Sequence, residues 1–167
     1  PNQLIKAVPG QGTHVPVWLL GSSLFSAQLA AQKGLPYAFA SHFAPRMMMD
    51  AIKLYRENFK PSATLNKPYV MLGVPLIAAD TDERAHYLAT SLYQRIINLM
   101  QGKSIKSLPP IQNMPPLSPQ LQAALNGFLG MAAIGSPDSV KKRLDQILQE
   151  TQADELIFTS DFYDMND

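Results

Sequence analysis

The chain has 167 residues, of which 46% are hydrophobic, so it can bury one compact core and is too short for two ordinary domains. Its formal net charge of +1 gives no reason to expect nucleic acid or an anionic membrane as a partner, and no apolar run is long enough to cross a bilayer. The sequence contains no cysteine, which excludes a disulfide framework, thiolate catalysis and a cysteine-based metal site.

A strand, a polar turn and a helix open the predicted structure. Residues 15–20 form a β-branched and aromatic run that predicts a strand, and Gly-Ser-Ser at 21–23 interrupts it. Residues 24–33 carry apolar side chains at helical spacing until a glycine ends the helix, and residues 37–41 follow as a second strand. A strand that ends in Gly-Ser-Ser before a helix presents backbone N–H groups and two hydroxyls at a positive helix N-terminus, where proteins bind phosphate.

A helix and a third strand are predicted next. Pro45 lies near the first turn of a helix that runs to about Phe59. Residues 69–79 are largely apolar and predict a strand, in which Gly73 and Pro75 favour a bulge or an irregular end. The helix therefore lies between two strands, as in a crossover connection.

The next segment is predicted to be a long helix followed by a loop. Asp80 and Glu83 have the spacing of an N-cap pair, and the helix that they begin runs to Gly102. Residues 103–119 are rich in proline and polar residues, so we expect no regular structure there. Loops of this length are usually functional or disordered, and we expect this one over the active-site side or packed as an insertion.

Two more helices and a last strand complete the prediction. A Ser-Pro pair at 118–119 begins a helix to about Met131, and a second pair at 136–137 begins another, with serine as the N-cap. Residues 141–143 place three positive charges on the second of these helices, for which a solvated face is the preferred interpretation. Residues 155–159, ELIFT, predict the fourth strand.

Four strands tied to helices imply parallel pairing with right-handed crossovers. Two architectures fit: a free-standing doubly wound sheet and half of a (β/α)8 barrel. The chain stops soon after the strand at 155–159 without a helix to cover that strand, whereas both faces of a parallel sheet are normally covered. The uncovered last strand therefore favours the second architecture, in which the chain is a fragment of a barrel.

Three segments also resemble one family of enzymes. The first reads LLGSS at 19–23 and continues as SAQLAAQKGLPYAFASHFAP at 26–45, the second is ADTDERAHYLATS at 79–91, and the third is GSPDSVKKRLDQILQETQADELIF at 135–158. In order and spacing they resemble the bacterial luciferase-like flavin monooxygenases, from about Val15 to Tyr163. The first segment is most similar to the alkanal monooxygenase-like, single-component-type branch.

The resemblance implies an α/β fold, namely the C-terminal half of a (β/α)8 TIM-type barrel with parallel strands and crossover helices, over residues 1–167. The N-terminal half of the barrel and a closing C-terminal helix would then be absent from this chain. The resemblance further implies an enzyme that uses reduced FMN and molecular oxygen on an organic substrate, with an aldehyde as one candidate. Open alternatives are a non-catalytic flavin-binding protein of the same fold and a deazaflavin-dependent oxidoreductase.

The expected partners follow from that chemistry. They are the flavin, a small organic substrate, a flavin reductase that supplies reduced FMN, and a second copy of the chain in a homodimer. Neither nucleic acid nor a membrane is expected as a partner. A cysteine-free chain is compatible with an intracellular protein, and we expect a cytoplasmic location.

By position, the resemblance implies that Ser23 and Ser26 bind the FMN phosphate, and that the backbone at Gly21 and Ser22 comes close to this phosphate. The two hydroxyls lie three residues apart at a helix start and so point to the same side. The alternative is that Ser22 or Ser23 simply caps the helix, and a single serine can do both.

Ser41 and His42 follow the second strand, at the end where barrel enzymes bind their ligands. His42 is a candidate for contact with the flavin ring or the substrate, and a hydrogen-bonded structural histidine is the alternative. No histidines or carboxylates have the spacing of a metal site, so no metal is expected. The chain shows no recognisable catalytic acid, base or nucleophile, and its catalytic residues stay unassigned.

Overall fold

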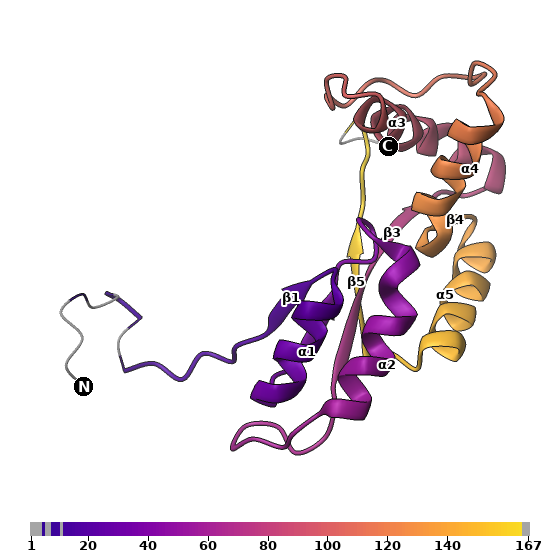
Figure 1. The fold of residues 1–167 in the computed structure, drawn as a ribbon. Helices are drawn as coiled ribbons and strands as arrows, with labels where there is room; N and C mark the ends of the chain where they lie inside the picture. Colours follow the sequence, from indigo (N-terminus) through magenta and orange to yellow (C-terminus); the bar gives the residue numbers. More distant parts are fainter. Residues whose placement is uncertain (1–4, 6–7, 11, 165–167) are drawn as a thin grey trace.

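The computed structural model describes residues 5, 8–10 and 12–164, which form a parallel sheet with helices packed against it (Figure 1). The strands are β1 (Leu19–Gly21), β2 (Tyr37–Phe39), β3 (Val70–Ala78), β4 (Ala133–Gly135) and β5 (Glu155–Thr159). The helices are α1 (Leu24–Lys33), α2 (Met48–Asn58), α3 (Asp82–Met100), α4 (Pro119–Phe128) and α5 (Pro137–Thr151), with 3-10 turns at Pro45–Met47 and Leu129–Met131. Residues 103–118 contain neither helix nor strand, as predicted.

All strand pairs in the described part of the chain are parallel. β1 pairs with β2, β2 with β3, and β3 with β5, so that Leu19 lies opposite Tyr37 and Leu72 opposite Leu156. Helices connect the successive strands, which is the crossover that parallel pairing requires. The predicted parallel α/β sheet with crossover helices is therefore confirmed.

Among the described residues, the helices cover one face of the sheet and leave the other face bare. Tyr37, Leu72 and Val74 are fully buried in a core to which α1, α2 and α5 contribute. Alternate strand positions point the opposite way, where Leu20 is 69% and Ile157 is 52% exposed. Since a parallel sheet normally has both faces covered, the bare face corresponds to the interior of a TIM-type barrel.

The first predicted strand, at 15–20, is shorter in the structure. β1 begins at Leu19, whose N–H donates to the Pro36 carbonyl oxygen at 3.0 Å. Val15 and Val17 precede the strand and are 70% and 63% exposed. β-branched residues favour a strand only where a neighbouring strand offers backbone partners, and β2 offers three paired positions.

The second predicted strand, at 37–41, ends earlier than expected. β2 stops at Phe39, because the Ser41 N–H donates to the Phe39 carbonyl oxygen at 2.9 Å and turns the chain away from the sheet. The Phe43 N–H then donates to the Ala40 carbonyl oxygen at 3.0 Å. This turn sets the position of the residues that follow β2.

The sheet contains a fifth strand that the sequence did not predict. β4 has three residues and pairs with Leu76–Ala78 at the end of β3. The prediction of a bulge or an irregular end at Gly73 and Pro75 is wrong, because β3 runs unbroken from 70 to 78. β3 instead changes partners along its length, from β2 and β5 in its first part to β4 in its last.

The N-terminus of α3 differs from the prediction by one residue. Thr81, not Asp80, has the extended N-cap conformation, and its Oγ1 accepts a hydrogen bond from the Arg84 N–H at 3.2 Å. Both threonine and aspartate are good N-caps, so only the backbone conformation distinguishes them. Gly34 ends α1 as predicted, with a φ of +62° that favours glycine.

Candidate functional site

The turn after β1 is organised by a capping box. Ser23 is the N-cap of α1: its Oγ accepts from the Ser26 N–H at 3.2 Å, and the Ser23 N–H donates to Ser26 Oγ at 3.3 Å. Ser26 Oγ also donates to the Ser23 carbonyl oxygen at 2.7 Å and lies 3.0 Å from the Tyr37 hydroxyl. The interpretation of Ser23 as an N-cap is confirmed, and the two predicted hydroxyls meet at 3.2 Å.

Gly21 leaves the space that this capping box occupies. A Cβ at position 21 would lie 2.3 Å from Ser26 Oγ, so a larger residue there would displace the serine. Ser26 is only 8% exposed, and its hydroxyl faces Tyr37 inside the fold. Burial raises the pKa of the Tyr37 hydroxyl, which therefore stays protonated at neutral pH. Ser26 therefore stabilises the turn from its buried side through its hydrogen bonds to Ser23.

The outer side of the same turn has the chemistry of an anion site. Ser22 and Ser23 are half-buried, and the N–H groups of Leu24 and Phe25 precede the first helical hydrogen bonds. The first turn of α1 contains no acidic residue, whereas those of α2, α3 and α5 do. A helix N-terminus without a carboxylate favours a negatively charged ligand. These residues therefore fit the phosphate group of a cofactor.

Ser41 lies at the end of β2 and connects this strand to β3. The residue is fully buried, and its Oγ donates a hydrogen bond to the Gly73 carbonyl oxygen. The hydroxyl that the sequence offered as a cofactor contact is thus engaged within the sheet. Ser41 fixes the point from which His42 leaves the strand.

His42 lies at the wall of a cavity. The centroid of its ring is 4.2 Å from that of Phe43, and its Nδ1 is buried without a hydrogen-bond partner among the described residues. A Cβ on Gly73 would lie 2.7 Å from Nδ1, so glycine makes room for the imidazole. Burial, and then the charge of Arg95, lower the pKa of His42, so the ring is neutral at pH 7. Nothing in these contacts supports a hydrogen-bonded structural role for Nδ1.

The cavity has a volume of about 450 Å³ and lies at the carboxyl ends of β2 and β5, against Pro75 in the second half of β3. Figure 1 shows α3, α4 and the loop between them gathered at this end of the sheet. The lining residues are mostly apolar and come from six parts of the chain: His42, Phe43, Pro75, Leu92, Arg95, Ile96, Leu99, Ile105, Phe128, Leu129, Thr159, Ser160 and Asp161. Small-molecule sites commonly combine this size with an apolar lining and a few polar groups.

An ion pair forms the polar end of the cavity. Arg95 Nη2, on α3, lies 2.5 Å from Asp161 Oδ2, just after β5, and the two side chains are 44% and 27% exposed. Sequence reasoning gave Asp161 no role, although its position directly after the last strand was a usable signal. Arg95 carried no signal, because it is one of several charged residues along a long amphipathic helix.

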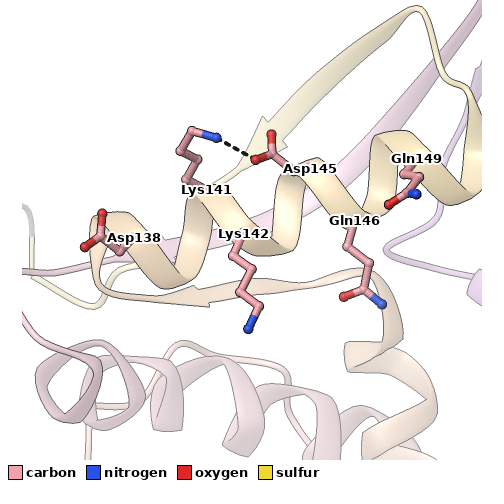
Figure 2. Close-up of a pocket in the computed structure, with 6 residues that line it drawn as sticks. All are labelled: Asp138, Lys141, Lys142, Asp145, Gln146 and Gln149. Carbon is pink, nitrogen blue, oxygen red and sulfur yellow. Dashed lines mark hydrogen bonds and ion pairs between the residues drawn. The ribbon is translucent and has the colours of Figure 1, made fainter.

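A second depression runs along the outer side of α5 and is lined by charged and amide side chains. Figure 2 shows its side chains directed away from the helix, with Lys141 paired to Asp145 at 2.5 Å. Both side chains of this pair are more than half exposed. The predicted solvated face is thus confirmed for Lys141, whereas Arg143 is half-buried and donates to the carbonyl oxygens of Ala132 and Gly130.

Neither a membrane-spanning helix nor a metal-binding cluster occurs among the described residues. None of the helices in this part of the chain has both the length and the apolar character needed to cross a membrane. Nor do these residues contain a group of three or more histidine and carboxylate side chains that could hold a metal ion.

Comparison with known proteins gives consistent matches. Residues 2–155 match the family model described as luciferase-like monooxygenase. The chain is 50% identical over 165 residues to a luciferase-like monooxygenase of Escherichia coli (strain K12), an alignment that covers 98% of this chain and 49% of that protein. Among solved structures, apo-MsnO8 is similar with a TM-score of 0.82 and 28% identity, over 99% of this chain and 51% of that one.

More distant structures share the fold alone. The oxygenating constituent of 3,6-diketocamphane monooxygenase from Pseudomonas putida, solved with FMN, has a TM-score of 0.54 and 14% identity over 87% of this chain and 42% of that chain. An F420-dependent secondary alcohol dehydrogenase has a TM-score of 0.57 and 13% identity over 93% of this chain and 46% of that chain.

Proposed function

The chain belongs to the luciferase-like monooxygenase family, and we propose that it is the flavin-binding part of an oxygenase that uses reduced FMN and molecular oxygen on an organic substrate. The observation that carries this proposal is the Gly-Ser-Ser turn before α1, which offers hydroxyls and backbone N–H groups and no carboxylate. The FMN complex of one structural neighbour supports FMN as the cofactor.

In this proposal each residue of the turn has its own part. Ser22 and Ser23 bind the phosphate through their hydroxyls and the neighbouring N–H groups, while Gly21 permits close approach of the backbone. Ser26 holds Ser23 in place from the buried side. Reduced FMN, when bound, supplies the electrons that activate dioxygen, and the chain itself binds and orients the reactants and excludes water.

The residues that follow β2 form the substrate side of the site in this proposal. Ser41 fixes the end of the strand through Gly73, and His42 faces the space where an organic substrate and the flavin ring would meet. Phe43 and the apolar wall of the cavity exclude water from that space. An aldehyde is one candidate substrate.

The chain spans about half the length of the curated relatives that it matches. The activity of the whole protein is therefore also a proposal. We expect the catalytic groups to come from the part of the barrel that this chain does not contain, so the 167-residue chain alone should not turn over substrate. We also propose a flavin reductase as the source of reduced FMN and a homodimer as the assembled enzyme.

A second candidate is hydride transfer with a deazaflavin. It is favoured by one observation, the similarity of the fold to that of an F420-dependent dehydrogenase. The same phosphate turn would serve either cofactor, whereas only the oxygenase would consume oxygen together with substrate.

The cofactor is tested by titrating the chain with FMN, riboflavin and a deazaflavin while flavin fluorescence is recorded. FMN should bind about tenfold or more tightly than riboflavin, because only FMN carries the phosphate. Equal affinities for FMN and riboflavin would contradict the phosphate site. Tighter binding of the deazaflavin than of FMN would favour the second candidate.

The reaction class needs a complete barrel. The chain should be produced together with the half of the Escherichia coli relative that it does not cover, and the purified pair supplied with FMN, a flavin reductase and NADH. Aldehyde-dependent oxygen uptake, with the oxidised product identified by mass spectrometry, supports the oxygenase. A well-folded pair that binds FMN and oxidises no member of a broad substrate panel would instead support a flavin-binding protein without turnover.

A further inference from the structure

Three hydroxyl groups meet on the buried side of the turn before α1. Ser26 Oγ lies 3.2 Å from Ser23 Oγ and 3.0 Å from the hydroxyl of Tyr37. Tyr37 is the first residue of β2 and is fully buried, so it reaches the turn from the neighbouring strand. Each hydroxyl has one proton to donate, and the number of acceptors therefore decides where each proton points.

The carbonyl oxygen of Ser23 is already fully used. It accepts from the Ser26 hydroxyl at 2.7 Å, the shortest contact of the cluster, and from the Ala27 N–H at 3.2 Å. These two donors occupy its two lone pairs. Tyr37 lies 3.3 Å from the same oxygen and only 3.0 Å from Ser26 Oγ, so its proton goes to Ser26. Burial raises the pKa of Tyr37, and the hydroxyl therefore keeps the proton that it donates.

Ser26 Oγ then faces more donors than it can accept. The Tyr37 hydroxyl, the Ser23 N–H at 3.3 Å and the Ser23 hydroxyl at 3.2 Å all lie within reach of its two lone pairs. The tyrosine hydroxyl and the N–H have no free acceptor elsewhere among the described residues. The Ser23 hydroxyl, in contrast, belongs to a half-buried side chain at the outer surface of the turn. Its proton is the one that can turn outward.

From this count we propose that Tyr37 is a positioning residue: its hydroxyl occupies Ser26 Oγ and so directs the Ser23 hydroxyl proton outward, where it donates to a phosphate oxygen. The inference rests on the proposed function, because the phosphate is the ligand assigned there to this turn. Tyr37 itself touches neither the cofactor nor a substrate. Without its hydroxyl, Ser26 Oγ would regain a free lone pair, and the Ser23 proton would turn inward and compete with phosphate binding.

Tyr37→Phe is the direct test. It removes the hydroxyl and keeps the ring, which packs against Phe39 and Tyr55. In fluorescence titrations of the full 167-residue chain, FMN affinity should fall about three- to tenfold, the effect of one neutral hydrogen bond. Riboflavin affinity should not change, because riboflavin has no phosphate. The ratio of the two affinities is thus the measured quantity.

Tyr55→Phe is the matched control. Its ring lies 5.3 Å from that of Tyr37, and it is also fully buried. Its hydroxyl donates to the Leu35 carbonyl oxygen at 2.8 Å and accepts from the Tyr69 N–H at 3.1 Å, away from the turn. The control should lower the melting temperature at least as much as Tyr37→Phe and leave the ratio of FMN to riboflavin affinity unchanged. An equal fall of this ratio in both variants would overturn the inference.

A double-mutant cycle with Ser23→Gly tests whether Tyr37 acts through Ser23. Once the Ser23 hydroxyl is gone, Tyr37→Phe should cause no further loss of FMN affinity. The same three- to tenfold loss in both backgrounds would show that Tyr37 acts by another route and would overturn the inference. A residue that only stabilised the core would give that additive result.

Inorganic phosphate provides a second probe that lacks the flavin ring. Its binding to the native chain, followed by NMR through the amide shifts of residues 22–25, should weaken by the same factor in Tyr37→Phe and stay unchanged in Tyr55→Phe. A native preference for FMN over riboflavin that Tyr37→Phe leaves intact would overturn this inference alone. Equal affinities of the native chain for FMN and riboflavin would overturn the proposed phosphate site, and this inference with it.

Discussion

Ser23 shows how one residue can stabilise a helix and also face a ligand. Its Oγ accepts a hydrogen bond from the Ser26 N–H, and this contact is an N-cap whether or not a phosphate is present. The hydroxyl is half-buried at a helix end that carries no acidic residue. The two functions can be separated experimentally, because glycine keeps most of the stability of an N-cap and lacks the hydroxyl.

We therefore predict that Ser23→Gly weakens FMN binding while it changes stability little. The loss should be about 1.5–3 kcal/mol, the value of one hydrogen bond to a charged group. Riboflavin binding should hardly change. Fluorescence titration of the folded variant with both flavins provides the measurement.

Ser118→Gly is the control for this prediction. Ser118 is the N-cap of α4, where its Oγ accepts from the Leu121 N–H at 3.3 Å. The substitution should cost the same few tenths of a kcal/mol in stability and leave FMN affinity unchanged. Equal FMN affinities in the two variants would mean that Ser23 only caps α1.

At the scale of the elements, Asp82 connects the first turns of α3 and α5. Its Oδ1 accepts from the Ser136 N–H at 2.6 Å and its Oδ2 from the Ser139 hydroxyl at 3.0 Å. These hydrogen bonds hold the pKa of Asp82 below its ordinary value. The carboxylate thus positions α5, and with it β4 and β5, relative to α3.

We predict that Asp82 contributes to stability near neutral pH and loses this contribution in acid. Because its pKa is lower in the folded state, the contribution is fully present above the unfolded value of about 3.9 and is lost as the pH falls through the folded value. Asp82→Asn should lower the melting temperature at pH 7, and the difference from the native chain should disappear at acid pH. Thermal unfolding, followed by circular dichroism from pH 7 down to a pH below the folded-state pKa of Asp82, tests this prediction.

Asp50→Asn provides the comparison for Asp82. Asp50 also lies in the first turn of a helix, α2, and makes no hydrogen bond to another helix in the described residues. Its substitution should leave only the small change expected from the helix dipole. If both variants shift the melting temperature equally, the link between α3 and α5 contributes nothing.

For the whole molecule, the bare face and the edges of the sheet are the dominant feature. Within the described residues β1 and β5 each pair with a single strand, so each presents an unpaired edge. Leu20 and Ile157 expose apolar surface on the face that the helices do not cover. Unpaired edges next to exposed apolar side chains favour association with another chain.

We predict that the purified chain self-associates through this face unless a complementary half is supplied. Leu20→Lys and Ile157→Lys should each reduce the associated fraction with little loss of stability, since both side chains are more than half exposed. Size-exclusion chromatography with light scattering gives the mass. Leu148→Lys, on α5 and 37% exposed, should not reduce association. A chain that stays monomeric at every concentration would contradict the open-face interpretation.

The sequence by itself determined the parallel α/β class, the family and the order of most elements. These depend on local signals: the periodicity of apolar residues, the serine caps at 118 and 136, and the glycine at 34 all act within one turn or strand. It also identified the turn at 21–23, because a strand, small polar residues and a helix are consecutive in the chain. The phosphate ligand itself stays a prediction.

Only the tertiary structure decided which residues meet across the sheet. β4 is too short to have a sequence pattern and is a strand because Leu76–Ala78 of β3 offer it backbone partners. Ser41 bonds to Gly73, and Arg95 pairs with Asp161, across 32 and 66 positions of the chain respectively, which no local pattern encodes. The cavity depends on these long-range contacts, because its wall is built where the ends of separate strands converge under α3.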